Sequence, residues 1–209
     1  MNAKQVDKSH YEFGKYMTKR RWASVWHQLD EVIKLNPERV LEVGPGPGLF
    51  KVAASVFDVH VETLDLDPDL SPDHVASVFE MPFDDGTFDV VCAFQMLEHL
   101  PFEQSLEAFR EMVRVASKAV VISLPDAGTR WPVSIHVPRI GDVKFSIPKP
   151  WLRAPAHQFD GEHYWEVNKK GYQVARIIRM LSGEAPASLI RRFRVPENPR
   201  HLFFVFGLR

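Results

Sequence analysis

The stretch RVLEVGPGPGLF, residues 39–50, decides the fold of this 209-residue chain. Its first five residues, Arg39–Val43, form a short apolar and β-branched run that is typical of a buried strand. Glycines then stand at alternate positions, and from Leu49 onward the apolar spacing becomes that of a helix. A strand, a glycine-rich turn and a helix in this order bring a ligand against backbone N–H groups. The stretch therefore predicts a ligand-binding turn.

The spacing of the glycines excludes two common kinds of ligand turn. Gly44, Gly46 and Gly48 permit unusual φ values and close approach of a ligand to the chain. A dinucleotide fingerprint would need its last glycine at position 49, which is Leu49. A phosphate-binding P-loop would need a following Gly-Lys-Ser/Thr, which is absent. The pattern is acidic-x-Gly-x-Gly-x-Gly, with a purely structural turn as the remaining alternative.

Apolar periodicity on both sides of the turn predicts alternating strands and helices. Helices are predicted over residues 18–35, 49–56 and 171–181, and the spacing of Leu106, Phe109, Val113 and Ala116 predicts a fourth. Strands are predicted over residues 39–43, 59–64, 88–94, 119–124, 188–195 and 201–208. This alternation implies parallel strands covered by helices on both faces. The last two strands have no helix between them, so they must form an antiparallel hairpin.

The composition is that of one globular domain over residues 1–209. The formal net charge of -1 provides no global field to attract a polyanion, so nucleic-acid binding has no compositional support. The chain lacks a run of about 20 apolar residues, and its charged N-terminus lacks the apolar core of a secretory signal. With Cys92 as the only cysteine, no intramolecular disulfide can form. We therefore expect a cytoplasmic protein without membrane association.

Two parts of this domain have separate expected roles. Residues 1–36 are expected to form an N-terminal helical cap, where Tyr11 and Tyr16 either fold over a ligand or simply pack. Residues 125–166 are rich in proline, aromatic residues and histidine and show no clear periodicity. Long structureless segments in compact domains are often lids or binding loops. We expect residues 125–166 to be a substrate lid, with a structural excursion or an oligomer contact as the alternatives.

An acidic residue follows the second predicted strand. Asp65 stands about twenty residues beyond the glycines, where a carboxylate can accept hydrogen bonds from both hydroxyls of a ribose. Asp67 is the neighbouring competitor, and a solvated loop acid is the alternative for either residue. We favour Asp65 as the ribose-binding residue.

Four segments in this order resemble class I S-adenosylmethionine-dependent methyltransferases of the type 11-like group. They are VLEVGPGPG (40–48), TLDLDP (63–68), EMPFDDGTFDVV (80–91) and MLEHL (96–100). The later FDGEHYWE (159–166) is similar to bacterial methyltransferases of undefined substrate. The resemblance covers residues 39–126, and the terminal hairpin matches the antiparallel sixth and seventh strands of that family. It implies an α/β, Rossmann-like fold with a doubly wound seven-stranded mixed sheet, mostly parallel.

The resemblance also implies a set of residues that bind S-adenosylmethionine. They are Glu42, Gly44, Pro45, Gly46, Gly48, Asp65, Leu66, Ser77, Val78, Phe94 and Gln95. The glycine backbone would hold the methionine part, Asp65 the ribose and Leu66 the adenine. Many relatives carry an aspartate at the position of Ser77, and a serine can accept a hydrogen bond there but has no charge. The last two residues of the set would lie near the sulfonium and the substrate.

Methyl transfer from a sulfonium needs mainly alignment and exclusion of water, although an oxygen nucleophile usually also needs a base. His99 follows the predicted cofactor-facing strand and is the candidate catalytic residue; the alternative is that it orients the next helix. Glu98 either shapes the cofactor pocket or begins that helix. His136, His163 and Tyr164 in the lid are the candidate substrate-binding residues. Histidines and acids of the lid lack a spacing such as His-x-x-x-His, so no metal site is expected.

The absence of two motifs narrows the methyl acceptor. An Asn/Asp-Pro-Pro-Tyr/Phe-like motif, usual in amino-methylating nucleic-acid enzymes, is missing after the fourth strand, where Phe94–Leu97 stands. A Pro-Cys nucleophile for cytosine-C5 chemistry is also missing. The sequence thus favours O-, N- or C-methylation of a small molecule, such as a sugar or another metabolite precursor. Two alternatives stay open: a non-catalytic S-adenosylmethionine-binding partner or regulatory subunit, and an NAD-dependent oxidoreductase.

Overall fold

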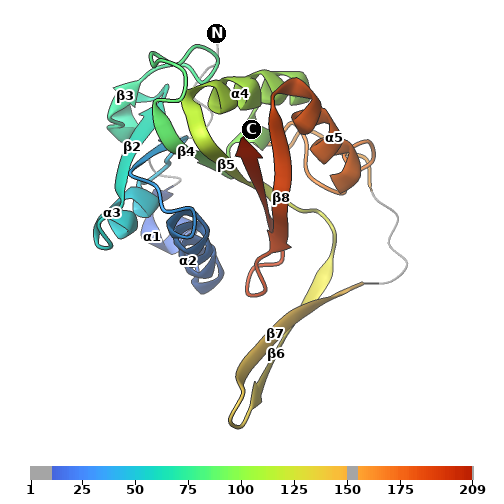
Figure 1. Cartoon of the computed structure of the whole chain (residues 1–209). Helices are drawn as coiled ribbons and strands as arrows, with labels where there is room; N and C mark the ends of the chain where they lie inside the picture. Colours follow the sequence, from blue (N-terminus) through green and yellow to red (C-terminus); the bar gives the residue numbers. More distant parts are fainter. Residues whose placement is uncertain (1–10, 150–154, 209) are drawn as a thin grey trace.

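A computed structural model describes residues 11–149 and 155–208 of the chain. Parts of the predicted cap (1–10) and of the predicted lid (150–154) lie outside the described residues. The central element is a seven-stranded sheet in the order β3-β2-β1-β4-β5-β9-β8 (Figure 1). Its strands are β1 (Arg39–Val43), β2 (His60–Asp65), β3 (His74–Val75), β4 (Phe88–Phe94), β5 (Ala116–Pro125), β8 (Ala187–Arg194) and β9 (His201–Leu208).

The pairing of the strands confirms the predicted mixed sheet. Strands β3, β2, β1, β4 and β5 pair in parallel, whereas β9 pairs antiparallel with both β5 and β8. The strand order reverses between β1 and β4, because the chain adds β2 and β3 on one side before it crosses to the other. In open α/β sheets, ligands bind beyond the carboxyl ends of the strands at such a reversal.

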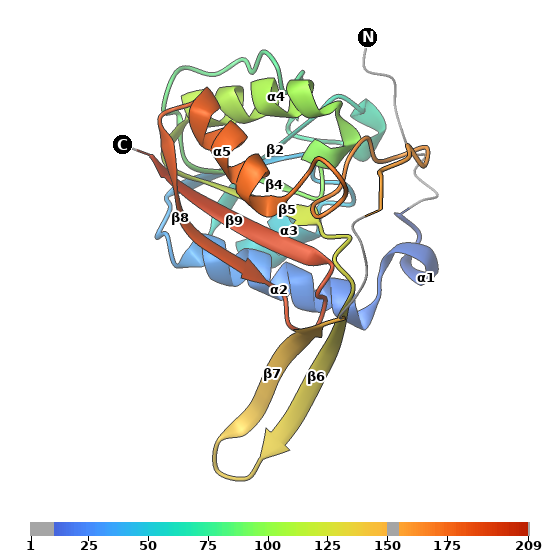
Figure 2. The same cartoon turned by 90° about the vertical axis from the view of Figure 1, so that its right-hand side faces the viewer.

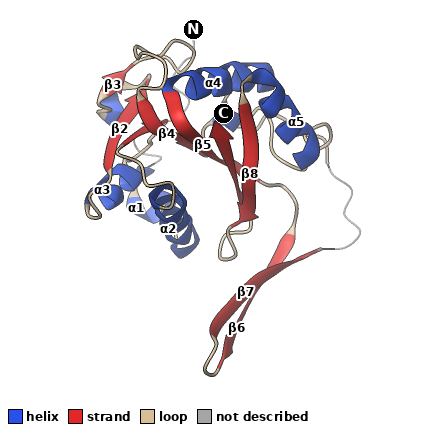
Figure 3. Cartoon of the chain, viewed as in Figure 1, coloured by secondary structure: helices blue, strands red, loops and turns tan. Residues whose placement is uncertain are grey.

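Helices cover both faces of the sheet, as the alternation of elements predicted (Figures 2 and 3). They are α1 (Phe13–Tyr16), α2 (Lys19–Ile33), α3 (Leu49–Ser55), α4 (Phe102–Val115) and α5 (Val174–Glu184), with short 3-10 turns η2 (Pro68–Leu70) and η3 (Leu97–His99). One core lies under α4 and α5 and includes Phe109 and Ile177. The other lies under α2 and α3 and includes Val32 and Phe50. No helix among the described residues is long and apolar enough to cross a membrane.

The ends of two helices show how local sequence sets the element boundaries. The hydroxyl of Thr18 accepts a hydrogen bond from the backbone N–H of Arg21 at 3.1 Å, which caps the start of α2. Asn36 follows the helix with a φ of 47°, a conformation that asparagine tolerates better than most residues. The predicted fourth helix is confirmed but ends one residue earlier, since Ala116 already belongs to β5.

The region expected to lack structure contains a β-hairpin, which corrects the sequence interpretation. Strands β6 (Arg130–Val137) and β7 (Gly141–Pro148) pair with each other and protrude from the body of the molecule (Figures 1 and 2). Its apolar pairs on one face are Trp131 with Ile147, Val133 with Phe145, and Ile135 with Val143. This period-2 alternation is present in the sequence, but Pro132 within it, together with Pro138 and Pro148, argues against a strand and concealed it.

Both ends of the predicted lid are fastened to the body at one place. Asp126 forms a bridge with Val167, and its Oδ1 accepts hydrogen bonds from Gly128 N at 2.6 Å and from Asn168 Nδ2 at 2.8 Å. Its other carboxylate oxygen pairs with Arg194 of β8. Because this carboxylate is almost fully buried and joins three segments, those of Gly128, Asn168 and Arg194, it fixes where the excursion leaves and rejoins the sheet.

Candidate active site

A cavity of about 830 Å³ lies at the carboxyl ends of β1, β2 and β4, where the strand order reverses. This volume is within the range of small-molecule and cofactor sites. Its lining residues from the sheet side are Val43, Gly44, Gly46, Leu64, Asp65, Leu66, Asp67, Ala76, Val78, Gln95, Met96 and His99. Tyr11 comes from the N-terminal segment, and Phe159, Gly161 and Tyr164 come from the predicted lid. The cavity therefore combines segments that lie far apart in the sequence.

The glycine turn forms one end of this cavity. Gly44 and Gly46 have φ values of 69° and 54°, in the left-handed region that favours glycine. The backbone N–H of Gly44 donates to Leu64 O of β2 at 2.9 Å. A Cβ added to Gly44 would lie 2.5 Å from Met96 Cγ, and one added to Gly46 would lie 3.1 Å from the Tyr11 ring. Any side chain at these two positions would thus strain the backbone and crowd the cavity wall.

Other predicted turn residues shape the turn without lining the cavity. Gly48, with a φ of 71°, precedes α3, and its N–H donates to Pro45 O at 3.0 Å. Glu42 is 3% exposed, and its Oε2 has no hydrogen-bond partner among the described residues. Burial raises the pKa of Glu42 to about 8, against the attraction of Lys51. This places Glu42 behind the turn, in the interior of the sheet.

Asp65 lies at the end of β2, directly beside the turn. Its Oδ1 accepts a hydrogen bond from Asp67 N at 2.9 Å, and burial raises its pKa. Asp67 also lines the cavity, but its carboxylate caps the 3-10 turn η2 by accepting from Asp69 N at 3.0 Å. Both acids are thus partly buried and accept a local backbone N–H, but Asp65 ends β2 itself, directly beside the glycine turn, whereas Asp67 caps η2.

An apolar wall continues from Asp65 toward the edge of the sheet. Leu66, Ala76 and Val78 line it, and the N–H of Ala76 donates to Asp65 O at 3.1 Å. Such a wall suits the flat face of an adenine. The predicted Ser77 is not among the lining residues, because its hydroxyl accepts a hydrogen bond from Phe79 N at 3.2 Å.

Tyr11 lies over the glycine turn and borders the cavity. Burial, together with the neighbouring Tyr16, Asp65 and Asp67, raises its pKa to about 12. The phenol therefore stays neutral near pH 7. Of the two tyrosines that the sequence offered as covers, the structure brings Tyr11 to the cavity, while Tyr16 borders a neighbouring surface hollow.

The end of β4 contributes Gln95 and Met96. Gln95 has a φ of 56°, which is uncommon for a residue with a side chain and marks a place that its surroundings constrain. Its N–H donates to Ser123 O at 2.9 Å, and its Nε2 donates to the Ser123 hydroxyl at 3.1 Å. The predicted Phe94 instead points into the core, where its ring contacts Phe50 at a centroid distance of 5.2 Å.

The other end of the cavity is formed by His99, at the close of η3. Its Nδ1 lies 3.0 Å from Glu162 O, and because a carbonyl only accepts, this nitrogen carries the proton. The lone pair of the ring is therefore on Nε2. Burial and the nearby His163 lower the pKa of His99, so the ring is neutral near pH 7.

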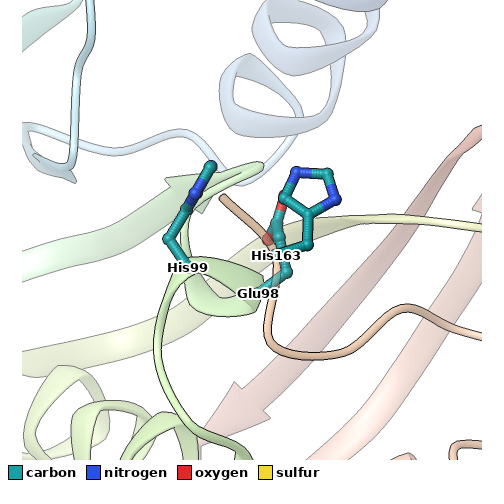
Figure 4. A group of neighbouring side chains, drawn as sticks. All are labelled: Glu98, His99 and His163. Atoms are coloured by element: carbon teal, nitrogen blue, oxygen red, sulfur yellow. The ribbon is translucent and has the colours of Figure 1, made fainter. Parts of the chain in front are cut away.

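Two further groups surround His99, as Figure 4 shows. The ring of His163 lies edge-to-face with that of His99, with a centroid distance of 5.0 Å. His163 Nδ1 lies 3.0 Å from Glu166 Oε1, and that hydrogen bond raises the pKa of His163. Glu98 is fully buried, and burial raises its pKa to about 8. Sequence reasoning had named these residues separately, and the fold brings them together.

The lid candidates divide into two groups. Tyr164 lines the cavity, and its N–H donates to Glu98 O at 2.8 Å. His136 lies on the protruding hairpin, with a side chain that is 72% exposed and an Nδ1 that lies 2.8 Å from Asp142 Oδ1. Neither His136 nor His163 lines the cavity, although the ring of His163 packs against that of His99, which does.

Three cavity-lining residues, Met96, Ala76 and Phe159, were not predicted, because apolar side chains give no functional signal in a sequence.

The groups that line the cavity fit a nucleoside that carries a sulfonium, such as S-adenosylmethionine. Open backbone at Gly44 and Gly46, a carboxylate at Asp65 and an apolar wall follow one another in the order of an amino acid, a ribose and a base. The P-loop chemistry for phosphates is missing from the turn. The carboxylates of Asp65, Asp67 and Asp69, which all line the cavity, would also repel a phosphate.

Comparison with known proteins gives a consistent result. A family model described as a methyltransferase domain matches residues 13–177. No curated protein sequence matches the chain.

Solved structures share the fold at low sequence identity. The 1,6-didemethyltoxoflavin-N1-methyltransferase of Burkholderia thailandensis, with bound 1,6-didemethyltoxoflavin and S-adenosylhomocysteine, is 12% identical with a TM-score of 0.62, over 96% of this chain and 84% of that one. The magnesium protoporphyrin IX methyltransferase of Synechocystis, with bound S-adenosylmethionine, is 11% identical with a TM-score of 0.60, over 97% of this chain and 90% of that one. A Clostridium acetobutylicum S-adenosylmethionine-dependent methyltransferase is 7% identical with a TM-score of 0.61, over 95% of each chain.

Proposed function

We propose that this chain, which belongs to the methyltransferase domain family, transfers a methyl group from S-adenosylmethionine to a small-molecule acceptor. The observation that carries the proposal is the single cavity that runs from the glycine turn and Asp65 to His99. One end suits the cofactor, and the other presents polar side chains to a second molecule. A methyltransferase domain favours an enzyme over the non-catalytic partner and over the NAD-dependent oxidoreductase.

The cofactor end is proposed to act by binding and orientation. The backbone at Gly44 and Gly46 would hold the methionine part, the Asp65 carboxylate the two ribose hydroxyls, and Leu66 and Val78 the adenine. Bound S-adenosylmethionine would supply an activated methyl group, which a nucleophile displaces with release of S-adenosylhomocysteine. Holding two reactants in line contributes roughly 7–11 kcal/mol to such reactions, which makes positioning the main task of these residues.

The acceptor end is proposed to act through His99. The Nδ1–H of His99 donates a hydrogen bond to Glu162 O, so Nε2 carries the lone pair of the ring. Nε2 is proposed to accept the proton that the nucleophile loses. Gln95 and Tyr164 are proposed to contact the acceptor, since both are polar and line the cavity. These polar groups suit a polar acceptor, such as a sugar or another metabolite precursor.

The peripheral segments are proposed to enclose the reaction. In a single domain over residues 1–209, the helical cap (1–36) contributes Tyr11, and the lid insertion (125–166) contributes Phe159, Gly161 and Tyr164 to the cavity. Excluding water from the site would favour transfer to the acceptor over side reactions. The hairpin within the lid insertion protrudes from the body of the molecule (Figure 1), and none of its residues lines the cavity, so the part after it forms the proposed cover.

Calorimetry followed by a transfer assay tests the proposal. S-adenosylmethionine, S-adenosylhomocysteine and NAD are titrated separately into the full chain, and one saturable site is expected for the first two only. Labelled S-adenosylmethionine is then incubated with metabolite extracts, and a labelled small molecule is expected. Binding of NAD alone would favour the oxidoreductase. Cofactor binding with no labelled product from any extract would favour the non-catalytic partner.

A further inference from the structure

Behind the acceptor end of the cavity, His99 belongs to a cluster whose composition the proposed methyl transfer does not require; His99 lines the cavity, whereas Glu98 and His163 lie next to it outside the lining. Glu98, His99 and His163 each offer a ligand atom, and these atoms all lie within 4.8 Å of one another (Figure 4). A second trio, Asp160, His163 and Glu166, meets the same distance limit and shares His163. Metal–nitrogen and metal–oxygen bonds are about 2.0–2.2 Å long, so two ligands of one ion lie at most about 4.4 Å apart, and small side-chain rotations would bring the three atoms to that distance.

Glu98 provides an independent indication of a ligand. Its side chain is fully buried, and neither carboxylate oxygen has a hydrogen-bond partner among the described residues. A buried polar group without a partner is costly, and buried carboxylates are normally paired or coordinate a metal. The side chain points toward His163 from the turn η3. A cation between them would satisfy this carboxylate.

Both histidines have the surroundings of metal ligands. Metal-bound imidazoles almost always donate their second ring N–H to a carboxylate or a backbone carbonyl, which fixes the ring and its tautomer. His99 Nδ1 donates to Glu162 O at 3.0 Å, and His163 Nδ1 donates to Glu166 Oε1 at 3.0 Å. In the neutral form of each ring, which metal binding requires, the lone pair is then on Nε2. Two imidazole rings fixed by these hydrogen bonds, next to a buried carboxylate without a partner, form the arrangement of a metal site.

We propose that Glu98, His99 and His163 bind one divalent transition-metal ion of the zinc type. Two imidazole nitrogens and one carboxylate suit zinc and its neighbours, whereas magnesium prefers an all-oxygen site. The proposal departs from the sequence expectation of no metal site. The usual ligand spacing is missing because the third ligand comes from a different segment, beyond the hairpin.

The site has the composition of a catalytic rather than a structural centre. Three protein ligands leave a coordination position for a water or a substrate. His99 lines the cavity, so that position would be reached from the acceptor end. A metal there would bind an acceptor hydroxyl, lower its pKa and let its proton pass to water before the oxygen attacks the methyl group. This role rests on the proposed function, and it makes His99 act through the ion rather than as the base itself.

Metal titration of the full chain tests the inference without an activity assay. The purified protein is treated with a chelator, and Zn²⁺ is titrated by calorimetry, with Co²⁺ absorption as a second probe of coordination. One ion per chain is expected. Glu98→Gln and His163→Ala are expected to weaken binding by more than about 100-fold, and Glu166→Gln, which disturbs only the support of His163, by about 10- to 100-fold.

His136→Ala is the matched control, because His136 is also a histidine paired with a carboxylate but is exposed on the hairpin. It is expected to leave Zn²⁺ affinity unchanged. Circular dichroism and S-adenosylhomocysteine titration of each variant separate misfolding from ligand loss. No Zn²⁺ or Co²⁺ binding by the native chain, or equal losses in the His136 and His163 variants, would overturn the inference.

The outcomes also separate this inference from the function on which it rests. S-adenosylhomocysteine that binds the metal-free chain, together with no metal binding, would remove the metal site and leave the methyltransferase with His99 as its base. A metal that binds while the cofactor does not would leave the metal site and remove the proposed function.

Discussion

The two ends of the cavity differ in how the chain builds them. The cofactor end is formed by residues that are close in sequence, since the turn at Gly44 and the acid at Asp65 both end neighbouring parallel strands. The acceptor end joins His99, after β4, to Gly161, His163 and Tyr164, beyond the β6–β7 hairpin. A common cofactor needs only a local pattern, whereas a particular acceptor needs side chains from distant segments. The first end is therefore general and the second specific.

The largest expected effect concerns the acceptor end alone. His99→Ala should leave S-adenosylmethionine affinity unchanged while turnover falls by about 100- to 10,000-fold, the usual contribution of a proton-transfer group. Calorimetry and steady-state kinetics on the same preparation measure the two quantities. Normal turnover would take His99 out of the catalysis, and a parallel loss of cofactor affinity would show that the two ends do not work separately.

The next largest effect concerns the cofactor end. Gly44→Ala places a Cβ at a positive φ and 2.5 Å from Met96 Cγ, so stability is expected to fall by roughly 1–3 kcal/mol, with a loss of cofactor binding. Urea denaturation and calorimetry measure both. The control is Gly183→Ala in α5, where an added Cβ meets no atom within 4 Å and the helix should gain roughly 0.5–1 kcal/mol. Equal behaviour of the two variants would contradict the role assigned to the turn.

A smaller effect separates two adjacent acids. Asp65→Ala is expected to weaken S-adenosylmethionine binding by about 1.5 kcal/mol, roughly tenfold, because hydrogen bonds to a charged acceptor are lost. Asp67→Ala is expected to cost less, since its carboxylate mainly caps η2. Calorimetric dissociation constants decide the matter. Full affinity in the Asp65 variant, or the larger loss in the Asp67 variant, would reverse the assignment.

The smallest expected effect is a pH dependence of the free energy of unfolding that comes from Asp73, which hydrogen-bonds Thr63 of β2. Burial alone would raise the pKa of Asp73, but hydrogen bonds from Lys51 and Thr63 lower this pKa to about 2. A lowered carboxyl pKa stabilises the fold above its unfolded value near 3.8, and that contribution is lost as the pH falls toward 2. The carboxylate is partly exposed, so the gain is under about 1 kcal/mol.

Asp73→Asn should therefore be less stable than the native chain at pH 7, and the difference should shrink below pH 3.8. Urea denaturation at several pH values measures it, with the exposed Asp84→Asn as control. A difference that stays constant down to the lowest pH would show that Asp73 does not stabilise β2 through its charge.

The sequence predicted the sheet and the cofactor end because both depend on local patterns. Strand β4 was predicted with its observed bounds, Phe88–Phe94, yet the assignment of Phe94 to the site was not supported. Since β4 is buried on both faces, its sequence does not show which face each side chain occupies. Phe94 falls on the face under α2 and α3.

The acceptor end was predicted only in part. His99, His163 and Tyr164 were chosen as candidates, but no pattern showed that the hairpin between them lets the later segment return to η3. His136 was chosen on residue type alone and lies on the hairpin instead. Convergence of distant segments depends on tertiary contacts such as the bridge at Asp126, which leave no spacing in the sequence.

A crystal structure of the full chain with S-adenosylhomocysteine tests the proposed cofactor site most directly. The methionine part is expected against the backbone of Gly44 and Gly46, the ribose hydroxyls within hydrogen-bond distance of Asp65, and the sulfur facing His99. A ligand bound outside this cavity, or one whose ribose lies away from Asp65 with the sulfur turned from His99, would contradict it.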